Sequence, residues 1–260
     1  MLRLFLLIAF LIFGAGFGNH WNHSSAITSG HCRPFDLRCT PGVGGGDQNI
    51  QSFSQNGNKI DTFIRTKLMS GIKFKGTFVE FGCADGVSNS NTYAFEKMGW
   101  YGLCIEASTV EFALAKTKRR NAIQSLIGAP GNFTFVEMVG DCMQASGIKE
   151  LYSPAFLSIY TDCKKKGLVK SETNVKSTPL AETLVNYGMD HVTWISADCE
   201  GCEYEFIRGF NFTRFDVQIF NYEDNTGARP HKQDIDRILT SHGFKLEFEA
   251  GDRLFVRASK

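Results

Sequence analysis

The sequence predicts an α/β domain with a mostly parallel sheet and helices on both faces. Short apolar segments of strand length alternate with helical segments from residue 60 to the end of the chain. A glycine turn follows the first of these strands, and no internal repeat interrupts the alternation. The chain has 260 residues, 43% of them hydrophobic, which is enough for one large core. We therefore expect an open Rossmann-like sandwich.

The expected elements follow one another in a regular order. Apolar residues at helical spacing predict a helix at 60–69, and the strand at 76–82 ends in the glycine turn. The first half continues with a helix at 91–97, a strand at 101–105, a helix at 110–119 and strands at 122–127 and 133–139. Residues 140–175 are poorly patterned and predict a loop or an insertion. The second half has helices at 179–187, 203–208 and 231–242, and strands at 192–197, 215–221, 244–248 and 253–257.

Two segments precede this domain. Residues 1–18 carry a positive charge near their start at Arg3, continue as an apolar run and end in small residues, which is typical of a secretory signal peptide. A type II signal anchor is the alternative, although a spanning helix needs about 20 apolar residues. Residues 19–57 are rich in Gly, Ser, Asn and His and predict a flexible linker or stalk. The folded domain should then occupy residues 58–260.

Composition and sequence patterns bear on compartment and partners. The 28 basic and 27 acidic residues nearly balance, which argues against a nucleic-acid partner. Three tripeptides have the pattern of glycosylation acceptors, at Asn22, Asn132 and Asn211. The eight cysteines could pair in an oxidising lumen, and we expect Cys32 with Cys39 and Cys142 with Cys163. We therefore expect a glycoprotein that is secreted or lies in the ER or Golgi lumen, or a membrane protein if the N-terminal segment remains as an anchor.

Acidic residues mark the end of the first expected strand, where ligands of such sheets bind. Gly82 permits a tight turn, while Asp85 and Gly86 shape the loop that follows Glu80. The segment lacks both the dinucleotide-binding glycine pattern and the lysine of a phosphate-binding loop. Acidic side chains would repel a phosphate, so a cationic ligand suits this loop better.

Glu106 ends the second expected strand, about 20 residues beyond the glycine loop, where a carboxylate can hold both ribose hydroxyls of a nucleoside. The glycine turn and this acid together fit a nucleoside cofactor without phosphates, namely S-adenosylmethionine. The alternative is a strand-to-helix turn in which Glu106 is a solvated cap.

Further carboxylates follow the strands at 192–197 and 215–221. They can deprotonate a hydroxyl or stabilise a sulfonium charge, and we expect Asp198 as the first candidate base, then Glu200, then Glu223. The alternative is a divalent cation such as Mg²⁺, which we do not favour, held by Asp198, Glu223, Asp224 and Asn225. Cys199 and Cys202 have no second pair at zinc spacing, so we expect a structural disulfide or two buried thiols.

Several separated motifs resemble the FkbM-type methyltransferases. They are Phe78-Val-Glu-Phe-Gly-Cys-Ala-Asp-Gly-Val, Gly99-Trp-Tyr-Gly-Leu-Cys-Ile-Glu106 and Asp198-Cys-Glu-Gly-Cys-Glu203, in the order of that family, within a resemblance from about residue 74 to 257. The resemblance implies a class I methyltransferase fold, S-adenosylmethionine as methyl donor, and O-methylation of sugar or natural-product hydroxyls. Cys83, Cys199 and Cys202 stand where the family usually has small or aliphatic residues.

The resemblance also implies roles for individual residues. Those expected to bind the methionine end of the cofactor are Glu80, Gly82, Asp85 and Gly86, with Asn91 contacting the same region. Glu106 is expected to bind the ribose, and Asp198 and Glu200 to lie nearest the transferred methyl group.

Two functions follow from these expectations. The first is an S-adenosylmethionine-dependent O-methyltransferase of the secretory pathway that acts on a glycan or another small hydroxylated acceptor. The second is a catalytically inactive protein of the same fold that binds cargo or a partner there. The acidic residues favour the first, because a binding protein has no physical need for an acidic cofactor site.

Overall fold

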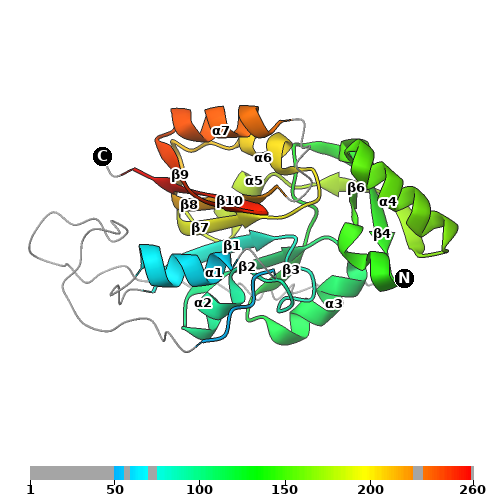
Figure 1. The fold of residues 1–260 in the computed structure, drawn as a ribbon, viewed down its shortest axis with the longest axis horizontal. Helices are drawn as coiled ribbons and strands as arrows, with labels where there is room; N and C mark the ends of the chain where they lie inside the picture. The colour runs from blue at the N-terminus through cyan, green and yellow to red at the C-terminus, as the bar shows by residue number, and fades with distance from the viewer. Residues whose placement is uncertain (1–49, 56–58, 70–74, 225–230, 259–260) are drawn as a thin grey trace, which may run out of the picture. The chain divides into compact units, whose positions relative to one another are not determined.

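The computed structural model describes residues 50–55, 59–69, 75–224 and 231–258, all of which belong to one compact unit spanning residues 33–260 (Figure 1). The expected signal segment, most of the linker, Asn22, the Cys32–Cys39 pair and Asn225 lie outside the described residues. In the described part of the chain, no helix combines the length and apolar character needed to cross a membrane.

A seven-stranded sheet forms the centre of the fold, in the order β3-β2-β1-β7-β8-β10-β9. Its strands are β1 (Thr77–Phe81), β2 (Tyr101–Glu106), β3 (Ala122–Gln124), β7 (His191–Ala197), β8 (Asp216–Glu223), β9 (Phe244–Ala250) and β10 (Asp252–Arg257). The pairs from β3 through β8 are parallel, whereas β10 is antiparallel to both β8 and β9. The predicted mostly parallel sheet is confirmed, and the order of its strands reverses between β1 and β7.

Helices cover both faces of this sheet, as the sequence predicts. They are α1 (Ile60–Phe63), which continues as a π-helical turn over Ile64–Leu68, α2 (Tyr93–Lys97), α3 (Thr109–Lys118), α5 (Leu180–Asn186), α6 (Glu203–Gly209) and α7 (Lys232–Ser241). Figure 1 shows α2 and α3 below the strands of this sheet, and α6 and α7 on the opposite side. Because side chains alternate along a strand, Phe78 packs with α1 and α2 while Val79 and Phe81 belong to the core under α5, α6 and α7.

A second, three-stranded sheet, together with the turns and the helix between its strands, contains the segment that we expected to be a loop or an insertion. Its strands are β4 (Gly131–Met138), β5 (Gly147–Ile148) and β6 (Val169–Ser177), in the order β5-β4-β6. Between them lie two 3₁₀ turns, Gly140–Ala145 and Lys149–Leu151, and helix α4 (Pro154–Lys165).

Of the two expectations for residues 140–175, the loop was therefore wrong, whereas an insertion agrees with the separate sheet and α4. Strand β6 is mostly exposed and carries few apolar residues, so its pairing with β4 leaves no hydrophobic period in the sequence. The predicted Cys142–Cys163 disulfide is confirmed, and it ties the first 3₁₀ turn to α4.

A buried arginine joins the loop after β1 to the end of α3. The side chain of Arg119 is fully buried, and its guanidinium donates to Glu80 at 3.0 Å and to Glu96 at 2.8 Å. It also donates to the carbonyl oxygen of Gly86 at 3.1 Å and to the Thr92 hydroxyl at 2.9 Å. One cation thus neutralises two buried carboxylates and fixes the path of the loop.

We expect Arg119→Met to lower the free energy of unfolding by about 3–5 kcal/mol, because it leaves Glu80 and Glu96 buried without their cation. The neighbouring Arg120→Met is the matched control, since Arg120 is exposed. Urea unfolding of both variants measures the difference. A loss in Arg119→Met no larger than in the control would contradict this account.

Candidate functional site

A pocket lies at the carboxyl ends of β1, β2, β7 and β8, where the strand order of the sheet reverses. Its polar lining includes five glutamate or aspartate side chains: Glu106, Glu111, Asp198, Glu200 and Glu223. Its apolar lining includes Phe81, Leu126, Ile127, Phe135 and Ile148. Among the lining residues that the structure describes there is no lysine, arginine or histidine. The pocket is therefore strongly acidic on one side and apolar on another.

Gly82 brings the loop after β1 into contact with the end of β7. Its φ is +74°, and a Cβ atom placed on it would lie 1.5 Å from the carbonyl oxygen of Asp198. A side chain at this position would thus displace Asp198. The expected need for glycine here has a steric cause in addition to the backbone conformation.

Asp85 and Gly86 shape the same loop without lining the pocket. The Asp85 carboxylate accepts from the backbone N–H groups of Val87 and Ser88 and pairs with Lys118 at 2.6 Å. These bonds hold the pKa of Asp85 below its ordinary value, against the opposing effect of burial. At Gly86 (φ +83°) a Cβ atom would lie 2.7 Å from Cγ of Arg119. Both residues therefore fix the shape of the loop from behind.

Glu80 and Asn91 also lie beneath the pocket and do not line it. Glu80 accepts from the backbone N–H of Asn91 at 2.6 Å and from the hydroxyls of Ser90 and Thr92, each at 2.7 Å. The Asn91 amide donates to Ser196 at 3.1 Å and to Asp252 at 3.2 Å. The structure thus gives both residues a positioning role under the glycine loop.

Glu106 lies in the pocket where the sequence places it. Its two carboxylate oxygens accept from the backbone N–H groups of Ala84 and Ser108, each at 2.8 Å. Burial raises its pKa to about 7, although these N–H groups oppose the shift. Each oxygen retains a second lone pair, so Glu106 can hold the glycine loop and still accept from a ligand.

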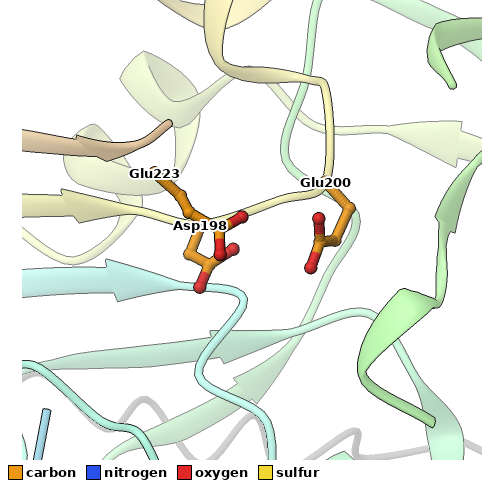
Figure 2. Close-up of side chains that lie close together, drawn as sticks. All are labelled: Asp198, Glu200 and Glu223. Carbon is orange, nitrogen blue, oxygen red and sulfur yellow. The ribbon is translucent and has the colours of Figure 1, made fainter. Parts of the chain in front are cut away.

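Asp198, Glu200 and Glu223 form the other acidic part of the pocket. One oxygen from each lies within 4.8 Å of the others, and Figure 2 shows the three side chains converging from the ends of β7 and β8. Burial raises the pKa of Asp198 well above its ordinary value, and the neighbouring Glu223 and Glu200 raise it further. The closeness of these carboxyl groups opposes the ionisation of Asp198, because like charges repel. All three expected catalytic residues are therefore together.

The turn after β7 is held rigidly around Glu200. A disulfide joins Cys199 to Cys202, as one of the two expected states of this pair. The buried carboxylate of Glu203 accepts from the backbone N–H groups of Cys199 and Gly201, each at 3.1 Å. Glu200 itself has a φ of +56°, in the left-handed region that costs free energy for a residue with a side chain. The turn therefore presents Glu200 to the pocket in a fixed conformation.

A second disulfide, which the sequence did not lead us to expect, holds the opposite wall. It joins Cys83, in the glycine loop, to Cys104, in β2. Both cysteines pack with Ala115 of α3 in a small buried cluster. Both loops that frame the pocket are thus covalently fixed.

The three clustered carboxylates also have the chemistry of a divalent-cation site, since hard cations prefer oxygen ligands. Of the other two residues that the sequence suggested for a cation, Asp224 is paired with Lys232 at 2.9 Å. Asn225 lies outside the described residues.

Sequence reasoning missed Glu111 and the apolar lining. Glu111 is 4% exposed, lies in the first turn of α3 and lines the pocket beside Glu106. A signal for it was present, because Ser108 and Glu111 have the spacing of a helix capping box. Apart from Phe81 of β1, the apolar residues come from β4, β5 and the segment after β3, whose positions relative to β1 depend on long-range packing.

Comparison with known proteins identifies the family to which the chain belongs. Residues 80–246, more than half of the chain, match the family described as the methyltransferase FkbM domain, so the chain belongs to that family. This confirms the resemblance found in the motifs and makes the protein a methyltransferase by class. No curated protein sequence shows significant similarity to the chain.

Among solved structures, the chain is similar to one titled as a SAM dependent methyltransferase from Aquifex aeolicus. The two are 13% identical, the match covers 72% of this chain and 85% of that chain, and the TM-score is 0.30. A likeness this distant says nothing further about function.

We expect Gly82→Ala to destabilise the protein by about 3 kcal/mol or more, because the added methyl group overlaps the Asp198 carbonyl oxygen. The matched control is Gly188→Ala, where φ is +65° and a Cβ atom meets nothing within 4 Å. That variant should lose only about 1–2 kcal/mol, the usual cost of a left-handed residue. Equal unfolding midpoints for the two variants would contradict the proposed contact.

Proposed function

We propose that this methyltransferase uses S-adenosylmethionine to methylate a hydroxyl of a glycan or another small hydroxylated acceptor in the secretory pathway. The observation that carries the proposal is the acidic lining of the pocket, which has five carboxyl groups, some of them protonated at neutral pH, and no basic side chain among the described lining residues. Such a lining favours a cationic ligand and opposes one that carries phosphates. Membership of a methyltransferase family supports the same class of chemistry.

The lining fits S-adenosylmethionine, which combines a sulfonium cation, a ribose and an adenine. Glu106 would hold the ribose, because hydroxyl groups can donate to its carboxylate oxygens. The apolar side chains of Leu126, Ile127 and Phe135 would cover a purine ring. The acidic cluster of Asp198, Glu200 and Glu223 would stabilise the positive charge at sulfur. When bound, this cofactor supplies an electrophilic methyl group.

The acceptor hydroxyl needs a base, because an alcohol is a poor nucleophile at neutral pH. Asp198 is half-buried and lines the pocket, whereas Glu223 is 1% exposed and lies beside it. The positive sulfonium would favour the ionised form of Asp198. In that form Asp198 would take the proton from the acceptor hydroxyl on a carboxylate oxygen, and Glu223 would orient it. Glu200, on the opposite side, would orient the acceptor.

An oxidising compartment is the finer part of the proposal. It is supported by the three disulfides of the described region, two of which hold the loops of the pocket. It is also supported by the exposure of Asn132 and Asn211, the two acceptor asparagines that the structure describes. Residues 1–18 would direct the chain there as a signal peptide or a type II anchor.

Binding of S-adenosylhomocysteine to the full chain tests the cofactor site. Calorimetric titration should detect binding by the wild-type protein and a loss of at least about tenfold in affinity in Glu106→Ala. Glu182→Ala is the control, because Glu182 is exposed on α5 and does not line the pocket. If the folded wild-type protein does not bind S-adenosylhomocysteine, S-adenosylmethionine is ruled out as its cofactor and the cargo-binding alternative is favoured.

Transfer of labelled methyl groups from S-adenosylmethionine to a panel of glycans and small alcohols tests the catalytic part. Asp198→Asn should retain affinity for S-adenosylhomocysteine but transfer about 10²–10⁴-fold more slowly, because it removes the base. Transfer by Asp198→Asn at the wild-type rate would rule out the proposed base.

A further inference from the structure

The start of α3 contains an incomplete capping box. The hydroxyl of Ser108 accepts from the backbone N–H of Glu111 at 3.3 Å, which is one half of that motif. In the complete motif the glutamate carboxylate accepts in return from the backbone N–H of the capping serine. Here that N–H donates to Glu106 at 2.8 Å instead. The Glu111 carboxyl is thus displaced from its usual partner.

Glu137 takes the remaining donors at this helix end. Its carboxylate accepts from the hydroxyls of Ser108 and Thr109 and from the backbone N–H of Val110, at 3.0, 2.6 and 3.1 Å. It also pairs with Lys170 at 2.8 Å. No described residue donates a hydrogen bond to the Glu111 carboxyl. A 4% exposed carboxyl group therefore lines the pocket next to Glu106 without a partner of its own.

The charged groups that face Glu111 are all acidic. They are Asp85 in the glycine loop, Glu106 at the end of β2 and Glu137 in β4, and with burial they raise the pKa of Glu111 to about 8. The nearby lysines form ion pairs with other carboxylates, Lys118 with Asp85 and Lys170 with Glu137. Glu111 consequently keeps its proton at neutral pH, and a neutral carboxyl group can donate a hydrogen bond as well as accept one.

We propose that Glu111 is a second recognition residue of the nucleoside pocket, and that its carboxyl group donates a hydrogen bond to an acceptor atom of the bound nucleoside. This inference rests on the proposed function and deepens it. Glu106 supplies hydrogen-bond acceptors for the ribose hydroxyls, while Glu111 supplies the donor that a ring nitrogen or ribose oxygen needs. The Glu111 carboxyl group, which in a complete capping box would bind the serine N–H, thus becomes part of the ligand site.

The proposal gives affinity a defined pH dependence. Below its pKa, Glu111 carries the proton and can donate; above it, the donor is lost. Affinity for S-adenosylhomocysteine should therefore fall between about pH 7.5 and 9.5, on either side of the pKa of about 8. A ligand with a neutral sulfur is the appropriate probe, because a sulfonium would be attracted to the newly ionised carboxylate.

Titration of the full chain with S-adenosylhomocysteine at pH 7.5 and 9.5 tests the inference in three proteins. Glu111→Leu should bind about tenfold more weakly than wild type at pH 7.5, the usual effect of one lost hydrogen bond. Glu111→Gln, whose amide can donate at both pH values, should bind nearly as well as wild type at pH 7.5. At pH 9.5 the wild type should bind about tenfold more weakly than Glu111→Gln.

The outcomes separate this inference from the function on which it rests. Wild-type affinity in Glu111→Leu, with weaker binding still caused by Glu106→Ala, would overturn the role of Glu111 and leave the cofactor site intact. Equal affinities of wild type and Glu111→Gln at pH 9.5 would also overturn that role, and this comparison remains valid if Glu111→Leu does not fold. No binding by the folded wild type would overturn both proposals.

Discussion

The architecture of the pocket depends on one buried cation placed behind it. Arg119 lies at the end of α3 and neutralises Glu80 and Glu96, while its contact with the Gly86 carbonyl oxygen fixes the loop after β1. This guanidinium is paired with Glu80 and Glu96 beneath the loop. The carboxyl groups that line the pocket therefore have no basic side chain beside them in the described lining. An acidic pocket at a sheet edge normally opposes folding, and the Arg119 network stabilises the scaffold that tolerates it.

Two disulfides and one close backbone contact fix the loops that carry the carboxyl groups of the pocket. Cys83–Cys104 attaches the glycine loop to β2, and Cys199–Cys202 closes the turn that carries Glu200. The close approach of Gly82 to the Asp198 carbonyl oxygen joins the two loops to each other. Methyl transfer depends on alignment of donor and acceptor, so a pocket with fixed walls suits the chemistry of the family.

Most of the fold and the acidic cluster could be predicted from the sequence, because strand ends of a parallel sheet meet at one edge. That rule alone brings Glu106, Asp198 and Glu223 together. It does not say which carboxylates face the ligand: Glu80 stands in a motif typical of cofactor binding, yet its carboxylate is directed to Arg119, 39 residues away. The second sheet was missed because β6 is stabilised by pairing with β4 and lacks an apolar face.

The central claim is that the charge of this pocket selects a cationic nucleoside. Titration of the full chain with S-adenosylmethionine and, separately, with adenosine triphosphate tests it most directly, because the two ligands share adenosine and differ in charge. The account predicts binding of S-adenosylmethionine and no detectable binding of adenosine triphosphate in the absence of metal. Comparable affinities for the two ligands would contradict it, because they would show that the carboxylates of the lining do not repel a phosphate chain.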